Sequence, residues 1–321
     1  MNDTVSVSVI MPTYNKSDII RRGLVPLLEQ EGLTQHYEVI VVDNNSIDDT
    51  VRVLDDFTKQ YPHLRYVVEE RRGAGAARNR GILESQGTLL IFVDDDIVVL
   101  PDHIVRHRAY HNRVENNLCV VALARDKAVF DSPILKQYVP VRCGTGPSEK
   151  CRYDVGIYLT SQNFSIRRDT LERVCFEGDG RVQYFDETFY RRQDGELGYR
   201  LDKAGVAFVY TKSIYCEHHH TFRRGDIVRR SYLSGYYLQR LHDKYPELKE
   251  RVPTLIIRNP LVNILLLLAG YVAFGVGYPF QWVSPWLMLK GVGSRLLYHA
   301  SHGYQQAMHD YRKSELYEQQ N

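Results

Sequence analysis

Cysteine is scarce in this chain: only five of its 321 residues are cysteines, and no two of them form a C-x2-C pair. A zinc site built on paired cysteines is therefore not expected. An odd, scattered set also fits a reducing cytosol better than a disulfide scaffold, which favours a cytoplasmic protein. The five are Cys119, Cys143, Cys151, Cys175 and Cys216.

A large excess of either charge is also missing. The chain has 41 lysines and arginines against 39 acidic residues, a formal net charge of +2. Binding to nucleic acid through bulk electrostatics is therefore not expected. The opening segment, MNDTVSVSVIMPTYN, has no basic stretch and no long apolar core. We therefore expect no secretory signal peptide.

Strand and helix patterns alternate through the first hundred residues. Apolar runs predict strands over 5–12, 37–43, 64–70 and 88–93. Helices are expected between them, the first capped by Ser17, the second by Asp48 or Asp49, and the third over 75–86. This order is typical of right-handed βαβ units, so we predict an α/β fold with a mostly parallel central sheet.

A later stretch, residues 196–211, predicts another helix and strand. Leu197, Leu201 and Ala204 share one helical face, Glu196 can pair with Arg200, and Gly205 suits the position after the last helical turn. The run VAFVYT then reads as a strand.

Polar clusters follow each of the first four predicted strands. They are PTYN, DNNS, RRGAG and DDD, in chain order. In sheets of this kind the ligand binds beyond the carboxyl ends of the strands. The clusters therefore predict one binding site along that edge.

The stretch LLIFVDDDIVVL places three adjacent carboxylates at the mouth of a buried strand. In an extended segment Asp94 and Asp96 share one side and Asp95 faces the other. The D-x-D-x-D-G spacing of a calcium loop is absent, whereas Mg²⁺ or Mn²⁺ needs few carboxylates when a substrate supplies phosphate oxygens. We infer a site for a divalent cation and a diphosphate. A solvated turn is the alternative.

Two further features favour a nucleotide. Asp43 ends a buried strand and can accept hydrogen bonds from a nucleobase or a ribose, although it could also cap a helix. Arg71, Arg72 and Arg78 surround a glycine-rich turn and could contact phosphates. The run GAGAAR resembles a dinucleotide-binding fingerprint, but it follows the third strand and has Arg78 at the sixth position, so a dehydrogenase is disfavoured.

Five segments resemble, in order and spacing, the family 2 glycosyltransferases. The resemblance covers about residues 1–240 and implies a catalytic domain of the GT-A fold, Rossmann-like, that binds a nucleotide-diphosphate sugar. Residues 241–321 would form a helical, apolar C-terminal region. The segments are VSVIMPTYNKSDII, EVIVVDNNSIDDT, GAGAARNRGI, LLIFVDDDIVV and RRQDGELGYRLDKAG.

The resemblance implies roles for the donor-side residues. Asp43 would bind the base, with Ser46 in the same turn, and Arg78 would lie near the nucleotide or diphosphate. The acidic triplet stands in for the family's D-x-D motif, with Asp95 nearer the ribose, Asp96 as the principal ligand of Mn²⁺ or Mg²⁺, and Asp94 assisting. The nucleotide pocket would be lined by Pro12, Thr13 and Asn15.

The resemblance also implies an acceptor side. Asp194 would be the catalytic base of an inverting transfer, and Gln193 replaces the family's usual glutamate before it. A helix N-cap is the alternative for Asp194. His218 and His220 match a histidine position near the metal or diphosphate, against the alternative of a surface histidine run. In SQNFSIRR, Asn163 is the residue predicted on the acceptor side.

Residues 261–280 are twenty residues without a charge, the length of one bilayer crossing. A membrane span, an in-plane or re-entrant anchor and a core helix hairpin remain open. With the tryptophans that follow, 261–289 predicts contact with a membrane. The family implies a glycan or lipid-linked acceptor and a location at the cytoplasmic face of the membrane, where nucleotide sugars are made.

The leading hypothesis is a metal-assisted inverting glycosyltransferase that builds a polysaccharide or a glycolipid. A nucleotidyltransferase is the first alternative, but it would need a glycine-rich basic loop directly after the first strand, where this chain has PTYN. A non-catalytic sugar-nucleotide-binding protein is the second alternative, and Gln193 beside Asp194 leaves it open.

Overall fold

In the computed structural model of this protein the chain divides into two units, one of residues 1–127 and 145–220 and the other of residues 128–144 and 221–321. The predicted site residues that the structure describes all fall within the first unit. The residues that the structure describes are 6–33, 36–113, 117–122, 124–127, 129–130, 159–219, 221–222 and 224–251.

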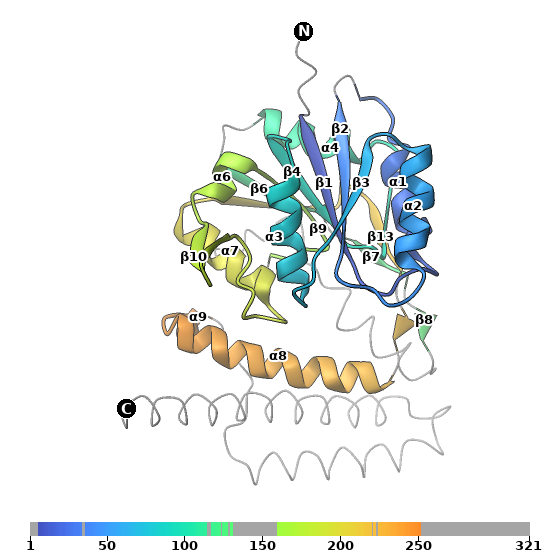
Figure 1. Ribbon diagram of the computed structural model, residues 1–321. Coiled ribbons are helices and arrows are strands. Elements are labelled where there is room, and N and C mark those ends of the chain that lie inside the picture. The colour runs from blue at the N-terminus through green and yellow to red at the C-terminus, as the bar shows by residue number, and fades with distance from the viewer. Residues whose placement is uncertain are drawn as a thin grey trace, which may run out of the picture. The chain divides into compact units, whose positions relative to one another are not determined.

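A seven-stranded sheet forms the centre of the first unit (Figure 1). Its order is β12-β6-β9-β4-β1-β2-β3, and every neighbouring pair is parallel except those of β9, which is antiparallel to both β4 and β6. The predicted mostly parallel sheet is confirmed. The strands are β1 (Val7–Thr13), β2 (Tyr37–Asp43), β3 (Leu64–Val68), β4 (Leu89–Val93), β6 (Leu118–Ala122), β9 (Asn163–Arg167) and β12 (Ala207–Thr211).

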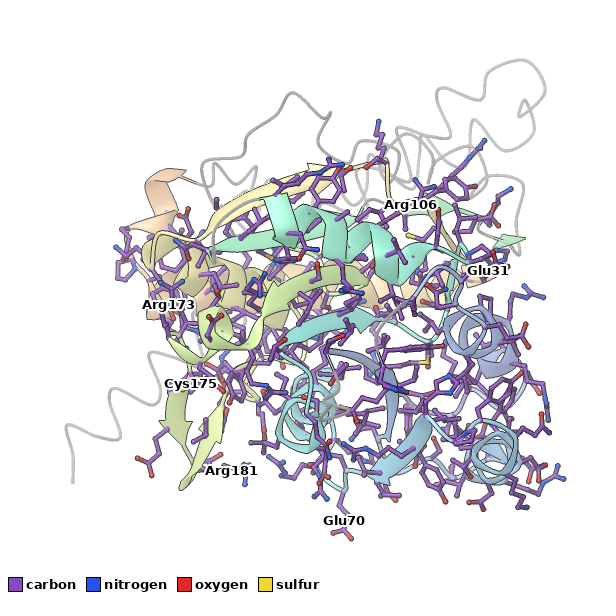
Figure 2. The ribbon with its side chains drawn as sticks, turned by 90° about the horizontal axis from the view of Figure 1, so that it is seen from above. Glu31, Glu70, Arg106, Arg173, Cys175 and Arg181 are labelled. Atoms are coloured by element: carbon purple, nitrogen blue, oxygen red, sulfur yellow. The ribbon has the colours of Figure 1, made fainter. Side chains whose placement is uncertain are left out.

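Helices cover both faces of this sheet. One face packs against α1 (Ile20–Leu28), α2 (Thr50–Gln60) and α4 (His103–Arg113). The other packs against α3 (Ala74–Glu84), α6 (Arg168–Glu172) and α7 (Gln193–Lys203). In Figure 2, Arg106 of α4 and Arg181 lie on opposite sides of the sheet.

The two-residue period of the strands supplies an apolar surface to each layer. In β1, Val9 and Met11 join the core under α1 and α2, while Ile10 joins the core under α3. Gly81 lets α3 approach closely, because a Cβ atom there would lie 2.4 Å from Cγ2 of Ile10. The core therefore fixes α3 tightly against β1.

Smaller elements complete the first unit. A three-stranded sheet of β5 (Ile97–Val99), β13 (Cys216–His218) and β7 (Arg125–Asp126) follows the acidic triplet, and β10 (Phe176–Gly178) pairs with β11 (Arg181–Gln183) as a hairpin. β13 runs antiparallel to β5, with His218 opposite Ile97. This pairing brings a distant histidine beside the triplet.

In the second unit the described elements are β8 (Val129–Phe130) paired with β14 (Thr221–Phe222), α8 (Arg224–Lys244) and α9 (Leu248–Arg251). Within the described part of the chain, every helix is too short or too polar to cross a bilayer. The predicted membrane segment, 261–289, lies outside the described residues.

The predicted helix ends are partly right. Ser17 does not cap α1, whose N-cap is Ile19; instead the hydroxyl of Ser17 donates to Oδ2 of Asp48. Asp49 occupies the N-cap position of α2, and Oδ1 of Asp48 accepts the N–H of Thr50 over 3.0 Å.

The predictions for α7 agree more closely with the structure. The predicted pair is present, with Nε of Arg200 donating to Oε1 of Glu196 over 3.0 Å, and Gly205 follows the C-cap with φ +74°. The helix begins at Gln193, three residues before the predicted start. Asp194 therefore lies inside its first turn.

Candidate active site

The polar clusters meet at the carboxyl edge of the sheet, as predicted. β4, β1 and β2 are neighbours, and their last residues are Val93, Thr13 and Asp43 (Figure 1). Two hydrogen bonds join the loops after β1 and β2: the N–H of Asn15 donates to Oγ of Ser46 over 2.8 Å, and the N–H of Ile47 donates to Oδ1 of Asn15 over 2.9 Å.

Pro12 lies in β1 opposite Val42 of β2. The pairing of β1 with β4 ends at Ile10 and Phe92, so the missing N–H of Pro12 breaks no ladder with β4.

Asp43 is almost fully buried, with 1% of its surface exposed. Its Oδ2 accepts the N–H of Ser46 over 3.0 Å, whereas its Oδ1 has no hydrogen-bond partner among the described residues. The helix-cap alternative is wrong, because Asp49 holds the N-cap of α2. A buried carboxylate oxygen without a partner is costly, so a ligand N–H or hydroxyl is the natural complement.

Asp95 turns toward β1. Its Oδ2 accepts the hydroxyl of Thr13 over 2.8 Å, and Nζ of Lys16 lies 3.7 Å from its Oδ1. Burial raises the pKa of Asp95 to about 7, and the charge of Lys16 opposes this shift. Sequence reasoning missed Lys16, although it directly follows PTYN.

Asp94 faces α3. Its Oδ1 accepts from Nη2 of Arg78 over 2.6 Å, and the Arg78 side chain is 3% exposed. Burial raises the pKa of Asp94, and Arg78 acts against this shift. Nε and Nη1 of Arg78 are buried without a hydrogen-bond partner among the described residues, so this guanidinium retains donors for an anion.

Asp96 faces β13. Nε2 of His218 lies 3.4 Å from Oδ1 of Asp96, and the N–H of His219 donates to the backbone oxygen of Asp96 over 2.7 Å. His220, predicted as a second histidine ligand, lies outside the described residues. Within the described ranges no group of three or more His, Cys, Asp or Glu side chains is arranged to hold a metal ion.

Asp194 is partly buried in the first turn of α7, two residues after the N-cap, Arg192, so the N-cap alternative is wrong. Its Oδ2 accepts the N–H of Ser161 over 3.2 Å, and its Oδ1 accepts the N–H of Gly195 over 2.9 Å.

Ser161 and Gln162 connect Asp194 to the acidic triplet. While Ser161 contacts Asp194, the backbone oxygen of Gln162 accepts the N–H of Asp94 over 3.0 Å. Nε2 of Gln162 also lies 3.4 Å from Nδ1 of His218. A single dipeptide thus joins the predicted base, the acidic triplet and the histidine.

The acceptor-side prediction for Asn163 is wrong. Asn163 is fully buried, its Oδ1 lies 3.1 Å from Nε2 of His107, and its Nδ2 donates to Sγ of Cys216. The amide of Asn163 is therefore used in contacts within the core, between β9, α4 and β13. In the same segment, Ser161 contacts Asp194 and Gln162 lies beside His218.

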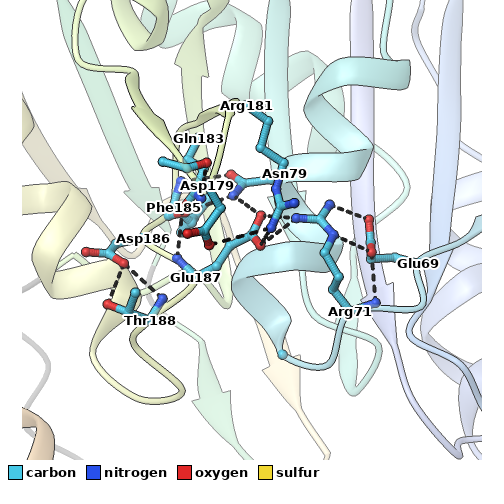
Figure 3. A network of polar contacts seen from close by, with 12 residues as sticks. Glu69, Arg71, Asn79, Asp179, Arg181, Gln183, Phe185, Asp186, Glu187 and Thr188 are labelled. Atoms are coloured by element: carbon cyan, nitrogen blue, oxygen red, sulfur yellow. Dashed lines mark hydrogen bonds and ion pairs between the residues drawn. The ribbon is translucent and has the colours of Figure 1, made fainter.

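The guanidinium of Arg71, which was expected to be able to contact phosphate, is instead bound by two carboxylates. Its guanidinium donates to Oε1 and Oε2 of Glu69 over 2.9 and 2.7 Å and to Oε1 of Glu187 over 2.7 Å (Figure 3). Two carboxylates hold it in place, one of them 116 positions away in the sequence. Of the other two predicted arginines, Arg72 is exposed, and Arg78 keeps two buried nitrogens without partners among the described residues.

Comparison with known proteins identifies the family. The family described as "Glycosyl transferase family 2" matches residues 8–175, just over half of the chain. The uncharacterized glycosyltransferase YfnE of Bacillus subtilis is 34% identical over 112 residues, which cover 35% of this chain and 28% of YfnE. The chain therefore matches less than a third of that relative's length.

A longer match is to the amylovoran biosynthesis glycosyltransferase AmsB of Erwinia amylovora, 28% identical over 226 residues that cover 69% of this chain and 72% of AmsB. Among solved structures, the mannosyltransferase PcManGT of Pyrobaculum calidifontis, in complex with GDP-Man and Mn²⁺, superposes with a TM-score of 0.65 at 17% identity. That superposition covers 96% of this chain and 88% of PcManGT.

The mostly parallel sheet, the helices on both of its faces and this structural likeness give the first unit a GT-A-type α/β fold. With the family match over residues 8–175, the chain belongs to the family 2 glycosyltransferases.

Proposed function

We propose that this protein transfers a sugar from a nucleotide-diphosphate sugar to a hydroxyl acceptor, with inversion and with the help of a divalent cation. One observation carries the proposal. Oδ1 of Asp43 and Nε and Nη1 of Arg78 are buried without hydrogen-bond partners among the described residues, at the same sheet edge as the acidic triplet. The carboxylate oxygen of Asp43 can accept a hydrogen bond from the base or the ribose, and the nitrogens of Arg78 can donate to the diphosphate. Together they match the two halves of a nucleotide-diphosphate sugar.

In this proposal the donor lies across the ends of β1, β2 and β4. Asp43 accepts from the base, within the turn that Ser46 and Asn15 hold together. Pro12 and Thr13 line the pocket, and Asp95, positioned by Thr13, lies nearer the ribose. Arg78 donates to the diphosphate through its two unpaired nitrogens.

Although no three of the described side chains already surround one point, the chemistry of the acidic triplet and His218 suits a divalent cation of the Mn²⁺ or Mg²⁺ kind. Asp96 faces His218 across 3.4 Å, and Asp94 and Asp96 repel each other, which raises the pKa of Asp94 further. Carboxylates and an imidazole suit Mn²⁺, and a diphosphate can supply the remaining ligands. We propose Asp96, Asp94 and His218 as the holders, with His220 as a further candidate. When bound, the cation would neutralise charge on the departing diphosphate.

Asp194 is the proposed catalytic base. Its carboxylate is fixed by the N–H groups of Ser161 and Gly195, so its orientation is set before an acceptor arrives. It takes the proton of the acceptor hydroxyl while that oxygen bonds to the anomeric carbon. The bond from this carbon to the diphosphate breaks, the nucleoside diphosphate leaves, and attack from the opposite face inverts the configuration.

The acceptor proposed is a glycan or a lipid-linked glycan, consistent with a relative named for amylovoran biosynthesis. We further propose catalysis by residues 1–240 at the cytoplasmic face of a membrane, with contact through 261–289 of the C-terminal region 241–321. The charge-free run 261–280 supports this part of the proposal.

The test is a donor panel. The protein is incubated with Mn²⁺ and UDP-glucose, UDP-galactose, UDP-N-acetylglucosamine or GDP-mannose, and the released nucleoside diphosphate is measured. Release selective for one donor supports the proposal. Binding of a donor without release across the panel would favour the non-catalytic alternative.

The base is tested with Asp194→Asn, which should abolish release while donor binding persists. Asp179→Asn is the matched control, because Asp179 is an exposed carboxylate that lies 3.9 Å from Arg181. Undiminished turnover in Asp194→Asn would remove Asp194 as the base.

A further inference from the structure

The backbone of Tyr184 and Phe185 is held by the side chain of Asn79 from α3 (Figure 3). Oδ1 of Asn79 accepts the N–H groups of Tyr184 and Phe185 over 3.1 and 2.8 Å, and Nδ2 donates to the backbone oxygen of Phe185 over 2.8 Å. Asn79 is 1% exposed. A buried amide in mid-helix is thus fully used by a segment a hundred residues away.

The same dipeptide is held from its other side by α7. Nη2 of Arg200 donates to the backbone oxygen of Tyr184, and Nη1 donates to that of Val174. Glu196, which is fully buried, fixes Arg200 with two hydrogen bonds to Nε and one to Nη2. The peptide of Tyr184 therefore lies between Asn79 and Arg200.

Each holder sits on a helix that carries a residue of the proposed active site. Asn79 directly follows Arg78, which pairs with Asp94, and the Arg78 guanidinium also lies 5.5 Å from the centre of the Phe185 ring. Arg200 lies on the helix whose first turn contains Asp194. The dipeptide thus connects the diphosphate side to the base.

A carboxylate network reinforces this connection. Nδ2 of Asn79 also donates to Oε1 of Glu187 over 3.0 Å, and Glu187 accepts from Arg71 and from Arg181 (Figure 3). Arg71 is anchored in turn by Glu69, at the end of β3. The segment after Phe185 is therefore tied to the sheet as well as to α3.

We propose that Asn79 is a positioning residue: by holding the backbone of Tyr184 and Phe185, it sets the place of Asp194 relative to Arg78 and the acidic triplet. Asparagine is a weak helix former, and burying its amide demands partners that an apolar residue would not need. Its hydrogen bonds to Tyr184 and Phe185 account for an asparagine in the middle of α3. The kinetic part of this inference rests on the proposed function.

The kinetic test compares Asn79→Ala with wild type, using the donor that the panel identifies. A displaced base should lower kcat by about 10- to 100-fold. The dissociation constant of the donor should stay within about twofold, because the donor contacts remain. Rescue of kcat is not expected from added Mn²⁺.

Ser8→Ala is the matched control. Ser8 is fully buried in β1 and bridges Glu38 and the N–H of Gly87, in the half of the strand away from its carboxyl end. Its loss should lower the Tm while kcat stays within about twofold of wild type. If Asn79→Ala changes kcat no more than Ser8→Ala does, or weakens donor binding as much as it lowers kcat, the inference is overturned.

A second measurement does not depend on activity. In hydrogen–deuterium exchange, Asn79→Ala should accelerate exchange in residues 184–189 and also in 193–197 at the start of α7. Faster exchange confined to 184–189 would overturn the inference.

Should Asn79→Ala fail to fold, Asn79→Asp takes its place in both measurements, since it keeps the volume but loses the donors to Phe185 and Glu187. A wild type inactive with every donor would refute the proposed function and leave the exchange result to decide on positioning.

Discussion

Arg78 and Asp94 form an ion pair of 2.6 Å between Nη2 and Oδ1, in which the arginine is the more deeply buried partner. The pair joins α3 to the acidic triplet. Because Nε and Nη1 find no partner among the described residues, a buried cation with spare donors lies beside a carboxylate cluster. Such a group suits an anion that arrives together with a metal ion.

Arg78→Lys should weaken binding of the nucleoside diphosphate. Lysine keeps the charge near Asp94 but not the planar set of donors, so we expect affinity to fall about tenfold, or about 1.4 kcal/mol. Isothermal titration with the product of the donor panel measures this. Arg80→Lys is the control, since Arg80 pairs with Glu84 at 2.8 Å on the same helix. Wild-type affinity in Arg78→Lys would contradict the assignment.

Asp43→Asn should also weaken nucleotide binding. The N–H of Ser46 requires an oxygen at the Oδ2 position, so the new amide must place its NH₂ where Oδ1 now lies. The amide N–H would then face an N–H or O–H group of the ligand, and we expect a loss of about 1–3 kcal/mol, roughly 5- to 150-fold in affinity. Asp56→Asn, an exposed change on α2, serves as the control. Equal affinity in the two variants would remove Asp43 from the base site.

Gly23→Ala should displace the backbone of the acidic triplet where it packs against α1. A Cβ atom on Gly23 of α1 would lie 2.7 Å from the backbone oxygen of Asp95. The backbone must shift, and overpacking of this kind costs about 1–3 kcal/mol. We expect a lower Tm together with weaker Mn²⁺-dependent donor binding. Gly75→Ala is the control, because its Cβ would meet nothing nearer than 3.6 Å. Unaltered stability in Gly23→Ala would show that the triplet tolerates the shift.

The sequence was sufficient to locate the candidate site but not to assign every residue in it. Parallel strands end at one edge, so the polar clusters that follow them had to converge, and Asp43, Asp94, Asp95 and Asp96 could be predicted from that rule alone. His218 needed the resemblance, because its partner strand β5 lies more than a hundred residues earlier.

The errors have a common physical origin. The amide of Asn163 is buried against His107, which lies 56 positions earlier in the sequence, whereas Ser161 and Gln162 lie in the turn before β9. Arg71 is offered by the sequence as one of three arginines that could contact phosphates, and its contact with Glu187, 116 positions away, cannot be foreseen from its neighbours. Long-range polar pairing leaves no local pattern in a sequence.

The histidines of α4 are a feature that the sequence analysis did not predict, and they make stability sensitive to acid. His103, His107 and His111 are spaced four residues apart and lie buried under the sheet. His107 and His111 both contact the hydroxyl of Ser165, at 2.8 Å each, and His107 also contacts Asn163. Both contacts to Ser165 can form when the two imidazole rings are neutral, because the Ser165 hydroxyl donates to one ring and accepts from the other.

Lowering the pH from 7 to 5 should therefore reduce the contribution of these histidines to stability, while the raised pKa values of Asp94 and Asp95 act in the opposite direction. Burial is the main cause of the lowered pKa values, to about 4 for His111 and well below 6.5 for His107. Below pH 6.5 the unfolded chain binds protons at these histidines that the folded protein does not, so their contribution to stability falls with pH, by up to about 1.4 kcal/mol per unit for each histidine. Urea unfolding at pH 7, 6 and 5 measures this slope. His107→Gln should reduce the slope, and an identical slope in the variant would show that His107 does not stay neutral in the fold.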